Sequence, residues 1–155
     1  MVGAQQAEQV QVRDEEAVST LVFHLGRELR TALDRRFESH GITSQQAALL
    51  LLSRLLKEPS PIKMAARLGT DAAGMTRLLD RLERKQLIVR RVSPDDRRFV
   101  VVELGPRSRH VLPRLIPEFK WAENGLLDGF KKSEVDQLNK MLRRLLQNAR
   151  RLNES

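Results

Sequence analysis

The side chains best suited to chemistry lie in one stretch, DAAGMTRLLDRLERKQLIVRRVSPDDRRFVVVEL, which covers residues 71–104. Cationic groups outnumber carboxylates there. Between Arg77 and Arg98 the cations are Arg77, Arg81, Arg84, Lys85, Arg90, Arg91, Arg97 and Arg98, and the carboxylates are Asp80, Glu83, Asp95 and Asp96. Guanidinium groups bind phosphate and can donate two hydrogen bonds to guanine. The chemistry that this stretch predicts is therefore recognition of a polyanion.

The first half of the stretch predicts a helix and the second half predicts a hairpin. Apolar residues recur at helical spacing at Met75, Leu78, Leu79 and Leu82. Two β-branched runs, at 87–92 and 98–104, flank the sequence Ser-Pro-Asp-Asp, which suits a turn with Pro94 at its second position. A helix fits the major groove of DNA, and a thin charged ribbon reaches the minor groove or the backbone. Together they predict a unit that reads DNA.

Ten residues of this unit form the predicted DNA-binding site. They are Ala73, Gly74, Thr76, Arg77, Arg81, Arg84, Lys85, Asp96, Arg97 and Arg98. Arg77 projects away from the apolar stripe, so we expect it to read a guanine, and a surface ion pair with Asp80 is the alternative. Ala73, Gly74 and Thr76 are small enough to approach the groove closely. For Gly74 a purely structural role is an equal alternative.

Arg81, Arg84 and Lys85 lie further along the same predicted helix. They clamp DNA phosphates or are merely solvated, and the sequence favours neither interpretation. Loss of one phosphate contact would weaken binding to every DNA sequence alike and would lower the salt dependence by about one counterion.

The elements before the basic helix predict a helix-turn-helix. A long helix is expected over 14–40, ended by Gly41, and Thr43 with Gln46 has the capping-box spacing that begins a second helix. The apolar run 47–56 makes this second helix central. A short third helix, with Pro61 at its first position, precedes the basic helix.

Two helices are expected after the hairpin. The first begins near Pro106 and runs to about Gly129, with a bend or break at Pro113 and Pro117. The second begins at Ser133. Its apolar seam has a mean spacing of 3.5 residues. The seam consists of Leu138, Leu142, Leu145, Ala149 and Leu152.

The first and last helices are predicted to form a dimer interface. The compact lobe between these two helices can bury its own apolar faces. The apolar stripes of the first and last helices would be buried partly by packing on each other and partly by a second copy of the chain. The alternative is a monomer in which both helices fold onto the lobe. We therefore divide the chain into a flexible 1–13, a dimerisation helix 14–40, a winged helix-turn-helix lobe 41–105, and C-terminal dimerisation helices 106–155. The fold class is mainly α with a small β wing.

Composition narrows the functional classes. The chain has 155 residues, no cysteine and a formal net charge of +8, which favours a polyanionic partner, although a basic surface is also common in soluble proteins. No apolar run is long enough to span a membrane, and the N-terminus lacks the apolar core of a signal peptide. We expect a cytoplasmic protein without disulfides or cofactors.

Residues 43–107 resemble the MarR family of winged-helix regulators. The matching segments are ITSQQAALLLLSRL and IKMAARLGTDAAGMTRLLDRLERKQLIVRRVSPDDRRFVVVEL, and the long flanking helices agree in position. Two positions depart from the family pattern. Gln86 replaces the usual glycine, and Leu104-Gly105 replaces Leu-Thr, so the helix after the wing lacks its usual threonine cap.

The resemblance implies an obligate, triangular dimer that represses neighbouring genes from a pseudo-palindromic operator. It implies a base-reading role for Arg77, and an Asp96 that orients an arginine at the wing tip while one of Arg97 and Arg98 enters the minor groove. It also implies release from DNA by a small aromatic or phenolic anion. The expected liners of that pocket are His24, Arg27, Arg30, Leu49, Arg109 and Leu112. Arg30 or Arg109 would pair its carboxylate, or each would form a surface ion pair.

The sequence gives less support to functions other than DNA binding. A winged-helix module that docks another protein is the main alternative to DNA binding. Nothing indicates an enzyme, because there is no nucleophile elbow, phosphate-binding glycine loop or paired carboxylates beside a histidine. His24, His40 and His110 lack metal-ligand spacing, so no metal site is expected. Trp121 packs in the fold or stacks on an aromatic effector.

Overall fold

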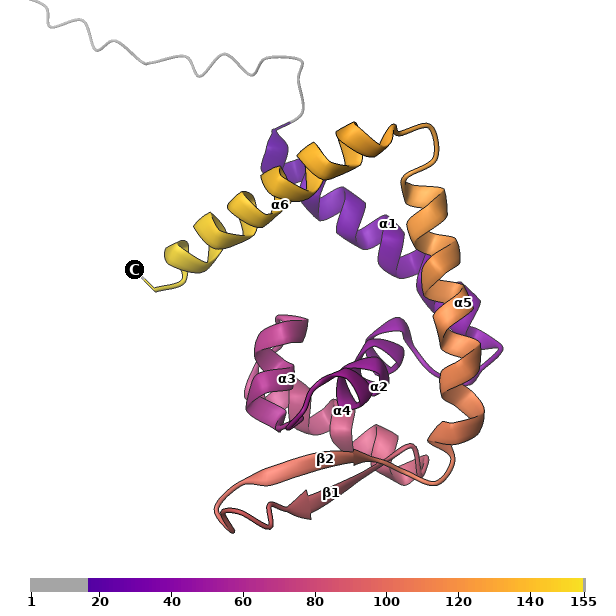
Figure 1. Cartoon of the computed structure of the whole chain (residues 1–155), viewed down its shortest axis with the longest axis vertical. Helices are drawn as coiled ribbons and strands as arrows, with labels where there is room; N and C mark the ends of the chain where they lie inside the picture. The colour runs from indigo at the N-terminus through magenta and orange to yellow at the C-terminus, as the bar shows by residue number, and fades with distance from the viewer. Residues whose placement is uncertain (1–16, 155) are drawn as a thin grey trace, which may run out of the picture.

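A computed structural model describes residues 17–154, so the flexible segment predicted for 1–13 lies outside the described residues. Within that range the chain has six helices and one two-stranded antiparallel sheet (Figure 1). They are α1 Val18–Glu38, α2 Ser44–Leu55, α3 Pro61–Leu68, α4 Ala72–Arg84, β1 Ile88–Val92, β2 Val100–Leu104, α5 Ser108–Leu126 and α6 Lys132–Leu152. The predicted fold class is confirmed.

The lobe is built around α2, as its apolar run predicted. Leu49 and Leu50 of α2 are fully buried and share the core with Met64 of α3 and Leu79 of α4. The hairpin closes this core with Val102, whose backbone N–H donates to the Pro59 carbonyl at 2.7 Å. The loop between α2 and α3 is thereby tied to the wing.

Local capping sets where the lobe helices begin. The Thr43 hydroxyl accepts from the Gln46 N–H while the Gln46 side chain accepts from the Thr43 N–H, so the predicted capping box is present. Ser60 caps α3 in front of Pro61. Gly69 ends α3 with a φ of 62°, a left-handed conformation that glycine adopts without a steric penalty.

Helix α5 differs from its prediction. It runs without interruption from Ser108 to Leu126 although Pro113 and Pro117 lie inside it, so the chain does not break there, and the alternative of a bend stays a prediction. Leu112 and Leu115 bury this part of the helix against the lobe. Apolar packing around the prolines offsets the hydrogen bonds that they cannot donate.

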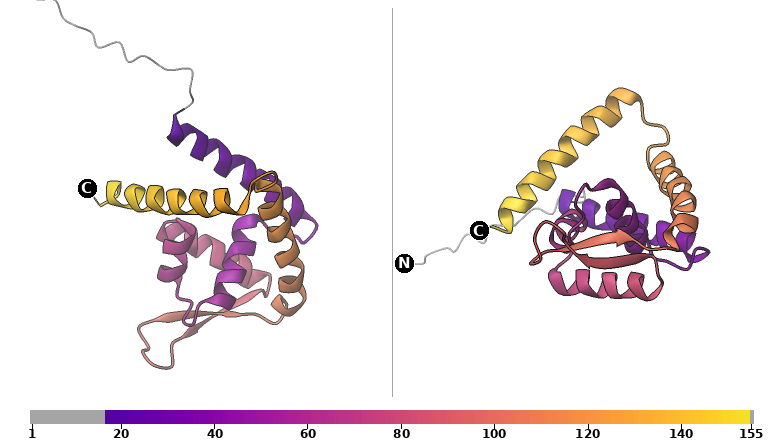
Figure 2. Two further views of the ribbon diagram at one scale, coloured as in Figure 1. Left: turned by 45° about the horizontal axis from the view of Figure 1, so that its top comes forward. Right: turned by 60° about the horizontal axis from the view of Figure 1, so that its bottom comes forward.

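Helix α1 packs against α5 and not against α6. The Arg36 Nε donates to Glu118 Oε2 at 2.6 Å, which lowers the Glu118 pKa, and the Arg36 guanidinium lies 4.5 Å from the centre of the Trp121 ring. The rings of Phe37 and Phe119 are 5.0 Å apart. Helix α6 has no buried side chain and begins at the end of α5 that lies remote from the wing (Figure 2). The expected packing of the first helix on the last is therefore not formed within one chain.

The junction between α4 and the wing explains why residue 105 is a glycine. Gln86 has a φ of 58°, the left-handed region where glycine is usual. Its carbonyl accepts from the Arg107 N–H at 3.2 Å and lies directly against Gly105. A Cβ on residue 105 would collide with that carbonyl and would lie 2.9 Å from the Ile88 nitrogen. Close packing therefore accounts for Gly105, whereas nothing in the structure explains a glutamine at position 86.

We predict that Gly105→Ala lowers the free energy of unfolding by about 1–3 kcal/mol, because its new methyl group must displace backbone atoms rather than a flexible side chain. Chemical denaturation monitored by circular dichroism measures the change. Gly26→Ala is the control, since nothing lies within 4 Å of a Cβ at that position. A Gly105→Ala protein as stable as wild type would contradict this account of the junction.

Candidate nucleic-acid interface

The exposed side of α4 presents five of the ten predicted DNA-binding residues. Met75, Leu78, Leu79 and Leu82 are buried in the core, which turns the other side of the helix outward. The predicted residues exposed on that outer side are Ala73, Thr76, Arg77, Arg81 and Arg84. The Thr76 hydroxyl donates to the Ala72 carbonyl at 2.9 Å, within its own helix.

The start of α4 is closely packed around Gly74. The Asp71 carboxylate caps the helix by accepting from the Gly74 N–H at 2.6 Å. A Cβ on residue 74 would lie 2.5 Å from the Thr70 hydroxyl and 2.9 Å from the Asp71 carboxylate. This packing supports the structural role that the sequence left open for Gly74, and its approach to DNA stays a prediction.

Arg77 is the arginine on α4 best placed to read a base. It makes no hydrogen bond or ion pair with any residue in the described part of the chain. The pairing with Asp80 that the sequence left open is not formed, because Asp80 accepts instead from Arg90 Nη2 at 2.7 Å. An exposed guanidinium without a protein partner keeps its donors available to an external acceptor.

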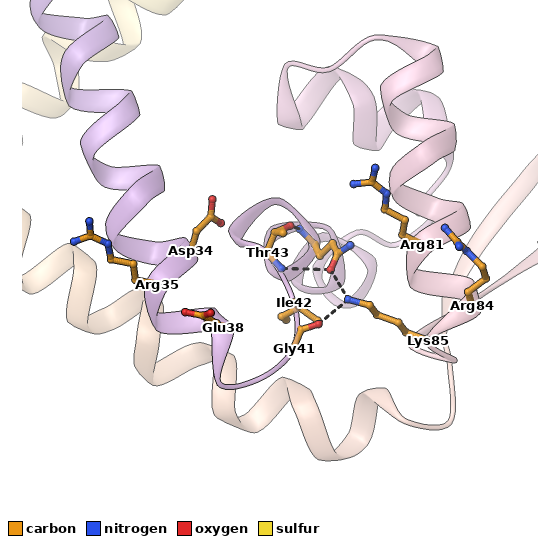
Figure 3. A pocket seen from close by; sticks show the side chains of 10 residues that line it. Asp34, Arg35, Glu38, Gly41, Ile42, Thr43, Arg81, Arg84 and Lys85 are labelled. Atoms are coloured by element: carbon orange, nitrogen blue, oxygen red, sulfur yellow. Dashed lines mark hydrogen bonds between the residues drawn. The ribbon is translucent and has the colours of Figure 1, made fainter.

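Lys85 differs from its neighbours because it is held by the protein itself. Its ammonium donates to the Gly41 carbonyl at 2.6 Å and to Gln46 Oε1 at 3.1 Å. These bonds lie at the edge of a hollow of about 730 Å³ between the end of α1 and the end of α4 (Figure 3). Arg81 and Arg84 line the α4 side of the same hollow. Lys85 is therefore committed to the loop between α1 and α2 rather than to an external phosphate.

The wing tip holds one arginine in a fixed position. Arg98 donates to both oxygens of Asp96, through Nε at 3.1 and 3.2 Å and through Nη2 at 2.7 Å. The Arg98 hydrogen bonds lower the Asp96 pKa, so the carboxylate remains charged and keeps its partner. The Arg98 side chain is nevertheless 84% exposed. Arg97 is exposed beside it and is not held by Asp96.

One site residue was missed at the level of sequence. Arg90 of β1 reaches from the wing to α4, where its Nε donates to Glu83 Oε2 at 3.0 Å and its Nη2 to Asp80. Its backbone N–H also donates to Glu83 Oε1 at 3.0 Å. The three side chains fix the wing relative to α4, so the two reading elements move as one body. The sequence showed that Arg90, Glu83 and Asp80 are oppositely charged and close along the chain, but it did not show that they contact each other.

This link predicts a defined pH dependence of stability. The Arg90 hydrogen bonds lower the pKa of Glu83 in the folded chain. The contribution of Glu83 to stability is therefore fully present above the pKa of an unfolded glutamate, and it is lost as pH falls through the lower, folded value. Because Glu83 is partly exposed, we expect Glu83→Gln to cost about 1 kcal/mol or less at neutral pH, and to cost nothing once the wild-type carboxyl is protonated.

Urea unfolding of wild type and Glu83→Gln across this pH range measures the gap between the two proteins. Glu123→Gln on α5 is the control, since it removes one exposed carboxylate away from the wing. A gap that stays constant or widens in acid would contradict the role of Glu83.

The six predicted effector-binding residues do not share one cavity. Arg109 and Leu112 line a hollow of about 620 Å³ between the end of α2, the base of the wing and the start of α5, together with Arg54. Arg27 and Arg30 line a separate hollow of about 300 Å³ on α1. The remaining two predicted residues, Leu49 and His24, line neither hollow. Leu49 is fully buried in the lobe core, and His24 lies exposed on α1.

Residues 17–154 contain neither a metal-ligand cluster nor a membrane-spanning helix. No three His, Cys, Asp or Glu side chains come together in a group that could hold a metal ion. None of the helices described combines the length and the apolar character needed to cross a membrane.

The fold and the site together define a class of protein. A helix-turn-helix whose second helix exposes arginines, followed by a hairpin with an arginine at its tip, is a winged helix-turn-helix of the DNA-binding type.

Comparisons with known proteins agree with this class. The sequence profile of the MarR family matches residues 42–100. The chain is 27% identical over 131 residues to the transcriptional repressor MprA of Escherichia coli K12, covering 83% of this chain and 74% of MprA. The solved structure of the transcriptional regulator PA3341 has 28% identity and a TM-score of 0.78, covering 87% of this chain and 99% of PA3341. The MepR–DNA complex of S. aureus has 24% identity and the same TM-score of 0.78, covering 86% of this chain and 99% of that one. Residues 42–100 therefore match the winged-helix domain of the MarR family, and the chain is similar over most of its length to transcriptional regulators of that family.

Proposed function

We propose that the protein is a homodimer that reads a pseudo-palindromic operator in double-stranded DNA. The observation that supports this best is the pairing of two readers on one rigid unit. Arg77 is unpartnered on the exposed side of α4, and Arg98 is held outward by Asp96 at the wing tip. Arg90 joins the two elements. In this proposal Arg77 donates to a guanine in the major groove, while Arg98 enters the adjacent minor groove.

Exposed apolar side chains on α1 and α6 support the dimer. Phe23 of α1 is 77% exposed, and α6 has an apolar stripe without a single buried member. The exposed large apolar residues of these two helices are Val18, Leu21, Val22, Phe23, Leu25, Met141, Leu142, Leu145, Leu146 and Leu152. A second copy would cover both faces by two-fold symmetry, and its two lobes would then meet DNA sites roughly 34 Å apart.

We further propose that the regulator represses transcription and is released by a small aromatic anion. The hollow lined by Arg54, Arg109 and Leu112 combines cations with apolar surface at the junction of lobe and α5. An aromatic carboxylate would place its ring on the apolar wall and its charge on an arginine. If it favours a spacing of the lobes that does not fit the operator, a coupling of about 1–3 kcal/mol would lower DNA affinity about 5- to 150-fold. Binding to chromosomal DNA would place the protein in the cytoplasm.

Two measurements on the full-length protein test the proposal. Sedimentation velocity gives the oligomeric state, and fluorescence anisotropy at several salt concentrations gives the affinity for a duplex selected from a random pool. We expect a dimer whose binding to the selected duplex falls steeply with salt and exceeds its binding to random DNA by about a thousandfold or more. A monomer without DNA affinity would overturn it and favour the protein-docking module.

A ligand screen tests the effector separately. Thermal shift with a panel of aromatic carboxylates should reveal stabilisation by binding, because a ligand that binds only the folded state raises the melting temperature. A hit should also weaken operator binding. Equal ligand affinity with and without operator would refute the coupling, since linkage requires each ligand to affect the other by the same factor.

A further inference from the structure

The loop end of the wing exposes three large apolar side chains next to its arginines. Val92 of β1 is 59% exposed, Val100 of β2 is 39% exposed, and Phe99 just before β2 is 53% exposed. Val92 and Val100 face each other in the strand register. The part of the hairpin nearer the lobe behaves differently, since Ile88 and the mid-strand Val102 are buried in the core. The apolar character of the wing therefore continues beyond the part that the lobe covers.

Phe99 is held in place although its ring is exposed. Its N–H donates to the Asp96 carbonyl at 3.0 Å, and its carbonyl accepts from the Ser93 N–H at 2.8 Å. These bonds close the turn and fix the backbone at the residue that follows Arg98. The Arg98 guanidinium lies 6.0 Å from the centre of the Phe99 ring. The turn between β1 and β2 projects from the lobe (Figure 2). It presents the cation of Arg98 beside the aromatic ring of Phe99.

We propose that Phe99 packs against the deoxyribose rings of the DNA minor groove that Arg98 enters. This inference rests on the proposed function, because it places a second side chain in the same groove. Phe99 adjoins Arg98 in sequence and in space, so a groove that admits the arginine brings sugars within reach of the ring. Sugar C–H groups form the walls of a minor groove, and proteins that bind there use apolar side chains against sugars and base steps. The flanking Arg97 and Arg98 supply the charge that attracts a polyanion to this tip.

The chemistry of this contact differs from that of an arginine. An aromatic ring neutralises no phosphate, so its contribution does not depend on counterion release. It also donates no hydrogen bond to a base edge. Phe99 would instead favour sequences whose minor groove opens or bends readily, such as those with pyrimidine–purine steps.

The experiment compares Phe99→Ala and Arg97→Ala in full-length protein on the selected duplex over a range of salt concentrations. We expect Phe99→Ala to weaken binding about tenfold, which is about 1.4 kcal/mol, by the same factor at every salt concentration. Arg97→Ala should lower the slope of log affinity against log salt by about one if it contacts a phosphate. Phe99→Leu should restore most of the lost affinity, because it restores apolar surface.

Hydroxyl-radical footprinting provides a direct readout, since the radical attacks deoxyribose. Phe99→Ala should lose protection only at the sugars beneath the wing. Unchanged melting temperatures would confirm that the exposed side chain is not needed for folding. Binding by Phe99→Ala within twofold of wild type, or a change in its salt slope, would overturn the proposal. Wild type that binds no duplex would instead overturn the proposed function, and this inference would fall with it.

Discussion

Replacing Leu142 and Leu145 of α6 with aspartate is expected to split the protein into monomers and to weaken binding to a full palindrome by roughly 10²–10⁴-fold. Both residues are exposed in one chain, at 40% and 42%, and lie on the apolar stripe that the proposed dimer buries. Two-fold symmetry places four new carboxylates in one interface, and each unpaired buried charge costs several kcal/mol. Without the partner, the second lobe no longer binds as part of the same molecule.

The design separates loss of the dimer from loss of the fold. Sedimentation velocity measures the oligomeric state, far-ultraviolet circular dichroism measures helix content, and anisotropy measures binding to the palindrome and to a single half-site. The half-site affinity should change little, because each lobe folds independently of α6. Gln147→Glu is the control, since it adds a carboxylate to the polar side of the same helix. If the double variant stays dimeric, α6 does not form the interface.

Replacing Arg77 with alanine is expected to cost about 1–3 kcal/mol of binding free energy on the selected operator and to blur discrimination at one base pair. The exposed guanidinium has no partner in the described part of the chain, so its donors are free to meet a guanine. On random DNA the loss should be much smaller. Competition of single-base operator variants against each protein measures the discrimination directly.

Two comparison variants sharpen this prediction. Arg77→Lys keeps the charge but not the planar pair of donors, so it should restore affinity for random DNA without restoring base discrimination. Arg144→Ala on α6 removes the same charge far from α4 and should leave both properties unchanged. Equal losses on operator and random DNA for Arg77→Ala would mean that Arg77 contacts a phosphate rather than a base.

The contacts of Arg90 affect how substitutions near the wing change DNA binding. Because Arg90 joins β1 to Glu83 and Asp80 of α4, the wing and the helix approach DNA in a fixed relative orientation. A substitution of Glu83 would therefore weaken DNA binding although Glu83 does not contact DNA. For this reason the control substitutions lie far from the contact between Arg90 and Glu83. Arg91 pairs with Glu103 across the hairpin at 2.8 Å and adds rigidity within the wing itself.

The local order of the lobe could be predicted from sequence because its signals act over a few residues. Thr43 with Gln46, Ser60 before Pro61, and Asp71 before the apolar stripe each satisfy backbone groups within one turn of their own helix. The exposed position of Arg77 follows from the same periodicity. The orientation of Arg98 by Asp96 is also local, since the two residues are only two positions apart.

Tertiary structure alone decided which polar groups meet across elements and which apolar surfaces remain uncovered. Composition could not show that Lys85 binds the Gly41 carbonyl, that Arg90 pairs with α4, or that Gln86 and Gly105 share one crowded junction. Packing around α5 also offsets the hydrogen bonds that its two prolines cannot donate, at the place where the sequence predicted a bend or a break. Periodicity and capping report the interactions of a residue with its neighbours in sequence. The partner of a long cation depends instead on distances between helices and strands, which only the packed core sets.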